Sequence, residues 1–298
     1  MSKLIQRLLI FFIGIPAVLA MVLLSQYNHL LIHIVLLAVE VIALNELYGI
    51  LKTKGSLQPK SFLLVLSVLP LIISYVISFF GFASEYVYMP FLLCSLFIMT
   101  KEVFFPTDKG NNNFEKSIYS ILSGIFILFY IGLLPTFISR LASLEKSVWY
   151  LSLYFVMTFI CDSFAWLFGM TLGKGNRGFI KVSPNKSIVG FIGGILGSIT
   201  VSLLAQHFFP QILPGHFYKS ILLGLVVSTF AITGDLVESL LKRSADYAKI
   251  LGSPFLHHTL TIGYEPPCGK AQTAADLLPA LLTNLMISIF RELGVCDS

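Results

Sequence analysis

Long apolar segments alternate with short polar links along almost the whole chain. Nine segments are apolar enough to be helices in a bilayer: residues 4–24, 30–51, 61–81, 86–105, 117–139, 148–172, 188–209, 217–241 and 277–290. A helix needs about 20 apolar residues to cross the hydrocarbon core, and the last segment is shorter than that. The pattern therefore predicts an all-α fold, a membrane helical bundle of eight or nine transmembrane helices. We expect the first segment to be a retained span and not a cleaved signal peptide.

The composition supports a membrane protein. Hydrophobic residues make up 56% of the 298 residues and charged residues only 12%, whereas roughly a quarter of an ordinary soluble domain is charged. This excludes a soluble enzyme, a disordered chain and a nucleic-acid-binding domain, so no nucleic acid is expected as a partner. The four cysteines are scattered, without a Cys-x-x-Cys pair, and they indicate neither a zinc site nor a disulfide framework.

Basic residues are concentrated in every second link. They precede the first segment and follow the second, fourth, sixth and eighth, whereas the links between carry few. Basic links stay on the cytoplasmic side of a membrane. We therefore expect an integral membrane protein with a cytoplasmic N-terminus, and a bacterial inner membrane is the default location. The net charge of +5 fits this loop bias and an attraction to anionic membrane lipid.

Several carboxylates fall within apolar segments, where an acid is costly unless it meets a partner, an ion or water. Asp162 and Asp235 lie in the cytoplasmic halves of their segments, and each segment leads into a basic link. Carboxylates beside cationic loops are what a magnesium–nucleotide site requires. Glu40 and Glu46, in the second segment, have a plainer interpretation as helix-packing or interfacial carboxylates.

The segment around Asp235 places further polar groups on one helix face. Glu238 is three residues after Asp235 and shares its face with Ser239 and Lys242. Lys242 and Arg243 are candidate phosphate ligands, although a positive-inside anchor is the commoner role for such a pair.

The link after the sixth segment is rich in glycine and basic residues, Gly173-Lys174-Gly175-Asn176-Arg177-Gly178, and it ends in Ser183-Pro184-Asn185-Lys186-Ser187. Ser183, Asn185 and Lys186 place donors at the start of a helix, which is typical of a phosphate cradle. A flexible basic loop is the alternative, and no Walker A pattern is present. The glycines that follow, at 190, 193, 194 and 197, predict close helix packing.

Three blocks together resemble the phosphatidate cytidylyltransferase (CDP-diacylglycerol synthase) family. The first is the Asp162 segment leading to Gly169 and Gly173-Lys174. The second is Ser183-Pro184-Asn185-Lys186-Ser187 followed by Gly190-Phe191-Ile192-Gly193-Gly194, which is similar to the family's SPxKTxEGxxGG. The third is Gly234-Asp235-Leu236-Val237-Glu238-Ser239-Leu240-Leu241-Lys242-Arg243, the beginning of the family signature.

The resemblance implies a nucleotidyltransferase that joins CTP to phosphatidic acid with Mg²⁺ as cofactor. It implies Asp235 and Asp162 as metal ligands and, with Lys242 and Arg243, as catalytic residues. Substrate contacts would come from Ser183, Asn185, Lys186, Glu238 and Ser239. It also implies a polar cavity open to the cytoplasm, lateral access for a two-tailed lipid, and a homodimer.

The sequence also departs from the family. Val189 replaces the usual Glu of the second block, and the signature ends after Tyr247, so acids expected downstream are missing. A reading-frame change is one explanation, because codons for residues 248–252 can be chosen that read Lys-Asp-Ser-Gly in another frame. We therefore divide the chain into N-terminal helices (1–116), a catalytic-type core (117–247) and an atypical tail (248–298). An inactive or frame-altered relative and a small-solute transporter are the alternative functions.

Overall fold

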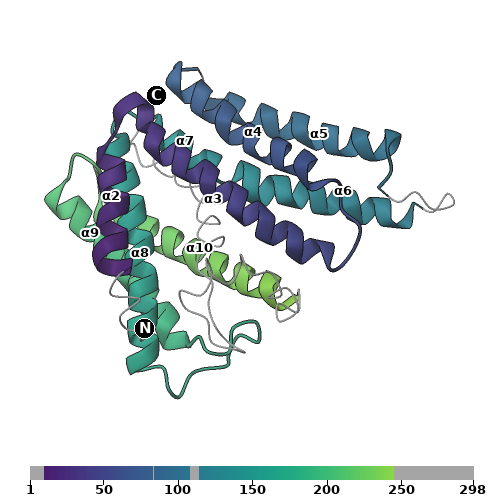
Figure 1. The fold of residues 1–298 in the computed structure, drawn as a ribbon. Helices are drawn as coiled ribbons and strands as arrows, with labels where there is room; N and C mark the ends of the chain where they lie inside the picture. Colours follow the sequence, from purple (N-terminus) through teal and green to yellow (C-terminus); the bar gives the residue numbers. More distant parts are fainter. Residues whose placement is uncertain (1–9, 83, 108–113, 245–298) are drawn as a thin grey trace.

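The computed structural model describes residues 10–82, 84–107 and 114–244, and these residues are helical with short links and no β-strand. Figure 1 shows the arrangement. The α-helices are α2 (Ile15–Leu23), α3 (Gln26–Lys52), α4 (Lys60–Phe79), α5 (Tyr88–Phe104), α6 (Glu115–Ile127), α7 (Thr136–Ala142), α8 (Ser147–Thr171), α9 (Ile188–Phe208) and α10 (Phe217–Ser244). Two π-helical segments, η1 (Ile10–Gly14) and η3 (Leu128–Leu133), and a 3-10 turn, η2 (Ser84–Val87), complete the set.

Six helical stretches are long and apolar enough to cross a membrane. They are Gln26–Lys52, Lys60–Phe79, Lys116–Ala142, Ser147–Thr171, Ile188–Phe208 and Phe217–Leu241. Each corresponds to one predicted segment, with ends that agree to within a few residues. The all-α membrane fold is thereby confirmed with six spans.

The other three predicted spans are not confirmed, so the count of eight or nine stays a prediction. Within the predicted 4–24, the structure describes only a short apolar helix, Phe12–Leu23. The predicted 86–105 corresponds to α5, which has 17 residues and is about 25 Å long at 1.5 Å per residue, less than the roughly 30 Å of a hydrocarbon core. The predicted 277–290 lies outside the described residues.

Helix α3 begins with a left-handed turn. Tyr27, Asn28 and His29 have φ values of 49°, 55° and 57°, a region that costs an L-residue roughly 1–2 kcal/mol. The turn is held by its neighbours: the Tyr75 hydroxyl donates to the Tyr27 carbonyl at 2.9 Å, and His29 Nε2 lies 2.9 Å from Ser147 Oγ. The regular right-handed helix therefore starts after residue 29, where the hydropathy pattern places it.

Hydrogen bonds join the helix ends that the charge pattern assigns to one side. At one end His29 bonds to Ser147, and His33 Nε2 lies 2.8 Å from Ser139 Oγ. At the other end Glu102 accepts hydrogen bonds from Gln58 and Ser120, each at 3.1 Å. For α3, α5, α6 and α8 these contacts agree with the predicted alternation in direction. The side of the membrane on which each end lies stays a prediction.

The helices form two groups that cross each other. Figure 1 shows α3, α4, α5 and α6 running alongside one another, whereas α2 and α8 run across them. Buried side chains such as Leu44, Ile98 and Leu151 form the core. Large apolar side chains on the outward helix faces are exposed, among them Val65 and Leu96. Such a surface is unfavourable in water and suits lipid.

Helices α8 and α9 pack through the predicted glycines. A Cβ atom on Gly190 would lie 2.7 Å from the Ala165 carbonyl oxygen, and one on Gly194 would lie 2.9 Å from that of Cys161. Such contacts leave no room for a side chain, so close packing is confirmed. The packing fixes the start of α9, and with it Lys186, beside the end of α8.

Candidate functional site

The site is built around the loop between α8 and α9. Helix α9 begins at Ile188 because Ser187 caps it: the Ser187 hydroxyl accepts a hydrogen bond from the Gly190 amide at 3.0 Å. The Ser187 side chain is buried, which makes this cap rigid. A serine in this position satisfies one of the free amides of the first helical turn.

The base of the loop is closed by backbone contacts. Arg177 and Ser187 form an isolated antiparallel bridge, and the Ile188 amide donates to the Asn176 carbonyl at 3.3 Å. The Arg177 guanidinium also donates to the Gly169 carbonyl, at 3.3 Å, near the end of α8. Residues 177–187 therefore form a loop whose two ends are held together by hydrogen bonds.

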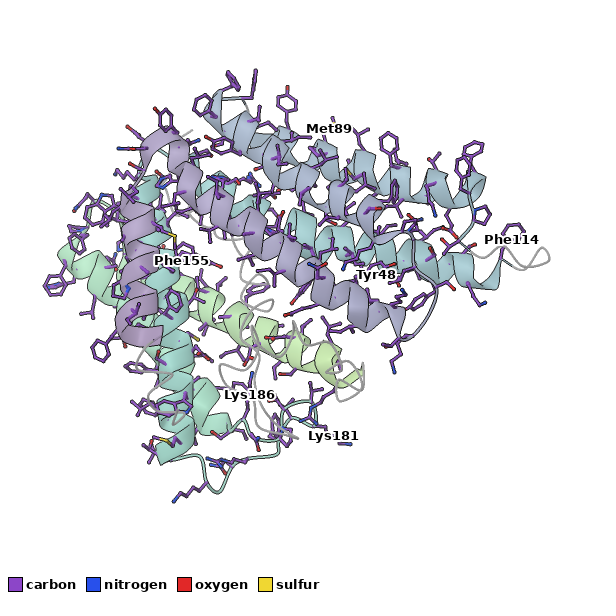
Figure 2. The ribbon with its side chains drawn as sticks, viewed as in Figure 1. Tyr48, Met89, Phe114, Phe155, Lys181 and Lys186 are labelled. Atoms are coloured by element: carbon purple, nitrogen blue, oxygen red, sulfur yellow. The ribbon has the colours of Figure 1, made fainter. Side chains whose placement is uncertain are left out.

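Lys186 pairs with Asp235 and so joins this loop to α10. The Lys186 side chain is 24% exposed and that of Asp235 is 50% exposed, so both groups remain open to solvent. The Lys186 ammonium also lies 5.8 Å from the centre of the Phe191 ring, one turn into α9. Figure 2 shows Lys186 and Lys181 in the loop after α8, with Lys181 near the end of α10. Two residues that the sequence singled out 49 positions apart are thus in contact.

The last turn of α10 meets the same loop. The Arg243 guanidinium donates a hydrogen bond to the Lys181 carbonyl at 3.4 Å. Lys242 lies beside Arg243 in α10, and its side chain is outside the described part of the structure. A cationic group of α10 therefore borders the loop that carries Lys186.

The other predicted acids lie nearby in different settings. Asp162 is exposed on α8 and follows the buried Cys161, which faces α9 at Gly194. Glu238 is buried, one turn after Asp235. The Ser239 hydroxyl donates to the Asp235 carbonyl at 2.9 Å within α10.

Ser183 and Asn185 lie in the turn that presents Lys186. The Ser183 amide donates to the Ile180 carbonyl and the Lys186 amide to the Ser183 carbonyl, each at 3.0 Å. Ser183 is half-buried and Asn185 is exposed.

Glu40 and Glu46 lie on α3, away from this loop. Glu40 is fully buried, and neither of its carboxylate oxygens has a hydrogen-bond partner within the described residues. Glu46 is half-buried.

The donors around Lys186 fit a magnesium ion that arrives with a nucleotide. The described part of the chain contains no group of three or more His, Cys, Asp or Glu side chains placed to hold a metal by themselves. Mg²⁺ does not require such a cage, because it is usually held by one or two carboxylates with phosphate oxygens and water. Asp235 offers such a carboxylate, and the neighbouring Lys186 offers a phosphate contact.

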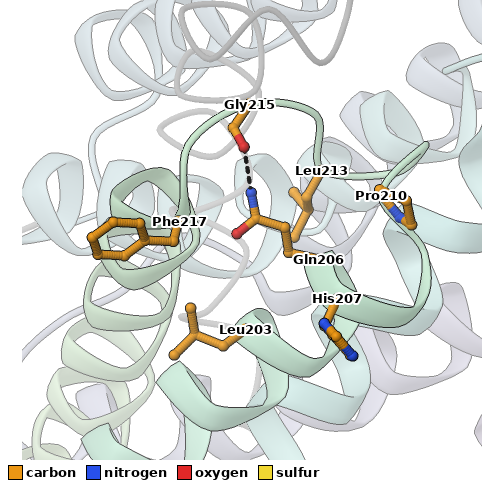
Figure 3. Close-up of a pocket in the computed structure, with 7 residues that line it drawn as sticks. All are labelled: Leu203, Gln206, His207, Pro210, Leu213, Gly215 and Phe217. Atoms are coloured by element: carbon orange, nitrogen blue, oxygen red, sulfur yellow. Dashed lines mark hydrogen bonds between the residues drawn. The ribbon is translucent and has the colours of Figure 1, made fainter.

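A pocket of about 460 Å³ lies at the opposite end of α9. Figure 3 shows its lining residues, Leu203, Gln206, His207, Pro210, Leu213, Gly215 and Phe217. The Gln206 side-chain amide donates a hydrogen bond to the Gly215 carbonyl at 2.8 Å, which joins two sides of the pocket. Gln206 is 20 residues from Lys186, about 30 Å along a helix. This pocket is therefore not the predicted cytoplasmic cavity, which remains unconfirmed.

Three residues of the site were missed from the sequence: Arg177, Ser187 and Phe191. Ser187 carried a usable signal, because a serine directly before an apolar helical run is a typical N-cap. Phe191 and Arg177 carried none, since their contacts with Lys186 and the Gly169 carbonyl depend on how the loop folds.

Comparison with known proteins gives a family match whose range includes these blocks. A profile described as "Cytidylyltransferase family" matches residues 5–250. The match ends three residues after Tyr247, where the sequence departs from the family signature.

Three curated relatives illustrate the similarity, and all are named phosphatidate cytidylyltransferase. That of Aquifex aeolicus is 34% identical over 137 residues, which is 45% of this chain and 49% of the relative. That of Staphylococcus epidermidis is 34% identical over 132 residues, 43% of this chain and 49% of the relative. That of Chlamydia trachomatis is 37% identical over 101 residues, 33% of each chain. The matched part of the chain thus spans about half the length of the first two relatives and about a third of the third.

Proposed function

Because the chain belongs to the cytidylyltransferase family, we propose that it transfers the cytidylyl group of CTP to phosphatidic acid. The products are CDP-diacylglycerol and pyrophosphate. The contact between Lys186 and Asp235 carries the proposal. It joins the two most specific sequence blocks and sets a cation beside a carboxylate where a magnesium-bound triphosphate requires both.

In the proposed reaction a phosphate oxygen of phosphatidic acid attacks the α-phosphorus of CTP. One P–O bond forms, the bond to the β-phosphate breaks, and pyrophosphate leaves. No covalent bond to the protein is needed, so the residues act by positioning substrates and by offsetting charge.

Each group of residues has a separate part in this proposal. Asp235 and Asp162 would hold Mg²⁺, whose contribution when bound is to neutralise charge on the triphosphate. Lys186, Lys242 and Arg243 would contact the phosphates. Ser183 and Asn185, in the turn before α9, and Glu238 and Ser239, beside Asp235 on α10, are the weaker substrate contacts.

The proposed topology has a cytoplasmic N-terminus and more crossings than the six long spans. Helix α5 supports one of them. Its Tyr88 hydroxyl accepts a hydrogen bond from Arg140, and its Glu102 accepts one from Ser120 at 3.1 Å. It therefore reaches both ends of the span Lys116–Ala142 and can cross the same thickness with 17 residues. We place the protein in a bacterial inner membrane as a homodimer with a cytoplasm-facing polar cavity.

The experiment is an assay of CDP-lipid formation from labelled CTP and phosphatidic acid by the purified chain in detergent. Replacement Asp235→Asn removes the charged ligand while keeping the shape, and activity should fall at least about 100-fold. Glu145→Gln is the matched control, since Glu145 is an exposed acid in the link at the opposite end. Activity that survives D235N would reject the metal role.

A chain without activity would favour the inactive or frame-altered relative. The genomic DNA across codons 240–300 then separates the two: a continuous frame that encodes residues 248–298 excludes the frame change. Nucleotide-independent solute flux in proteoliposomes would instead indicate the transporter.

A further inference from the structure

An aromatic side chain stands exposed on the loop between α8 and α9. Phe179 is 72% exposed, and it follows Gly178, whose φ of +84° turns the backbone sharply. Burying a phenylalanine stabilises a protein by roughly 1.5–3 kcal/mol. The ends of this loop are held in place, and Phe179 is nevertheless exposed on the protein surface. We take this to indicate that the Phe179 side chain is buried in an apolar environment outside the protein.

The loop around Phe179 is uniformly basic. From Gly173 to Ser187 it contains Lys174, Arg177, Lys181 and Lys186 and no acidic residue. Lys186 is engaged by Asp235, while Lys174 and Lys181 are exposed on either side of Phe179. An exposed aromatic ring between lysines is typical of a segment at the surface of an anionic membrane.

The fold holds this loop close to a bilayer. Helices α8 and α9 are both membrane spans, and their close glycine packing makes them leave the membrane side by side. The contacts of Arg177 with Ser187 and Gly169 keep the base of the loop near the end of α8, and the Lys181 carbonyl accepts a hydrogen bond from Arg243 of α10. Leu172, at the end of α8, is also 63% exposed and extends the apolar surface toward the loop.

We propose that the loop is a membrane anchor in which Phe179 enters the boundary between headgroups and acyl chains while Lys174 and Lys181 bind anionic lipid phosphates. Its partner is the surface of the bilayer that holds the protein. The anchor goes beyond the proposed transfer reaction and does not depend on it, because any anionic phospholipid can fill this role.

The test uses the full chain with Phe179→Trp in nanodiscs, read as the difference in fluorescence from the parent protein. With phosphatidylcholine and phosphatidic acid, we expect a blue-shifted emission. Lipids brominated near the headgroup should quench the F179W signal more than lipids brominated near the chain end. Quenching should weaken in pure phosphatidylcholine and in the F179W/K174E/K181E variant.

Two controls show whether the lysines respond to lipid phosphate or to a soluble phosphate, and whether the response depends on the basic loop. Phe82→Trp is the matched control, because Phe82 is 60% exposed in a link whose own sequence has no basic residue. The neighbouring Arg140 is half-buried and bonded to the Tyr88 hydroxyl, so phosphatidic acid should leave the quenching at position 82 unchanged. Adding CTP or inorganic phosphate to phosphatidylcholine nanodiscs tests a soluble ligand. Three results would reject the anchor. The F179W emission could be water-like and unquenched by lipid, or its quenching could be the same in F179W/K174E/K181E. Soluble phosphate or CTP could also produce the blue shift that phosphatidic acid produces. Each of these results leaves the CDP-lipid assay unaffected.

Discussion

The Lys186 ammonium is held from two directions, by the Asp235 carboxylate and by the Phe191 ring. Neither contact contributes much to folding, because exposed ion pairs are worth about 0–1 kcal/mol and exposed cation–π contacts about 0.5–1 kcal/mol. Their effect is instead to restrict a long, flexible side chain to one position. Such restriction matters for a residue that must meet a phosphate.

Replacing Phe191 should therefore affect substrate use more than stability. In F191L we expect the KM for CTP to rise about two- to fivefold, which corresponds to the loss of one cation–π contact. F191W keeps an aromatic face and should behave as the parent. CTP titrations of CDP-lipid synthesis measure the effect, with I192L as control because Ile192 is an exposed neighbour. Equal KM values for F191L and F191W would contradict a role of the ring.

At the level of elements, the interface between α8 and α9 determines where the site forms. The position of the loop depends on the packing of the two helices that it joins. These helices approach each other closely at Gly190 and Gly194. Any side chain there must push the helices apart, and the start of α9 would move away from Asp235.

Gly194→Val should lower stability and activity together. The added Cβ would meet the Cys161 carbonyl oxygen at 2.9 Å and the Ala165 Cβ at 3.2 Å, and such overpacking typically costs 1–3 kcal/mol. Thermal unfolding in detergent, followed by circular dichroism, should show a lower midpoint for G194V. Gly49→Ala is the control, because a Cβ at Gly49 meets nothing within 4 Å. An unchanged midpoint for G194V would show that α8 and α9 pack differently.

The elements also show what the sequence could and could not predict. Hydropathy located the six long spans because each is a mainly apolar run, and it placed the start of the right-handed part of α3 correctly at residue 30. It did not reveal the π-helical segment Leu128–Leu133, since a change of hydrogen-bond register leaves an apolar run apolar. Charge and glycine patterns led to Lys186 and Asp235, but the hydrogen bond of Arg177 to the Gly169 carbonyl arises only once the loop has folded back on α8.

For the whole molecule, one buried carboxylate joins the helices of the group that contains α3 to α6. Glu102 is 3% exposed, and it accepts hydrogen bonds from Gln58, Thr107, Ser117 and Ser120. These partners come from the link between α3 and α4, the link after α5, and α6. This role could not be predicted from the sequence, because Glu102 follows Lys101 at the end of an apolar run and resembles an ordinary interfacial charge.

The Glu102 and Asp235 carboxylates should therefore differ in what the loss of their charge affects, stability for Glu102 and activity for Asp235. In Glu102→Gln an amide replaces an acceptor that several donors share, and hydrogen bonds to a charged group are worth about 1.5–3 kcal/mol each. We expect E102Q to lower the free energy of unfolding by at least about 2 kcal/mol.

Asp235→Asn disrupts only a half-exposed ion pair, so D235N should unfold like the parent while losing CDP-lipid synthesis. Thermal midpoints and activities of both variants, measured in one detergent, test this separation, and E145Q should change neither quantity. A stable E102Q would mean that the Glu102 network does not hold the helices together, and an unstable D235N would mean that Asp235 supports the fold and not the chemistry.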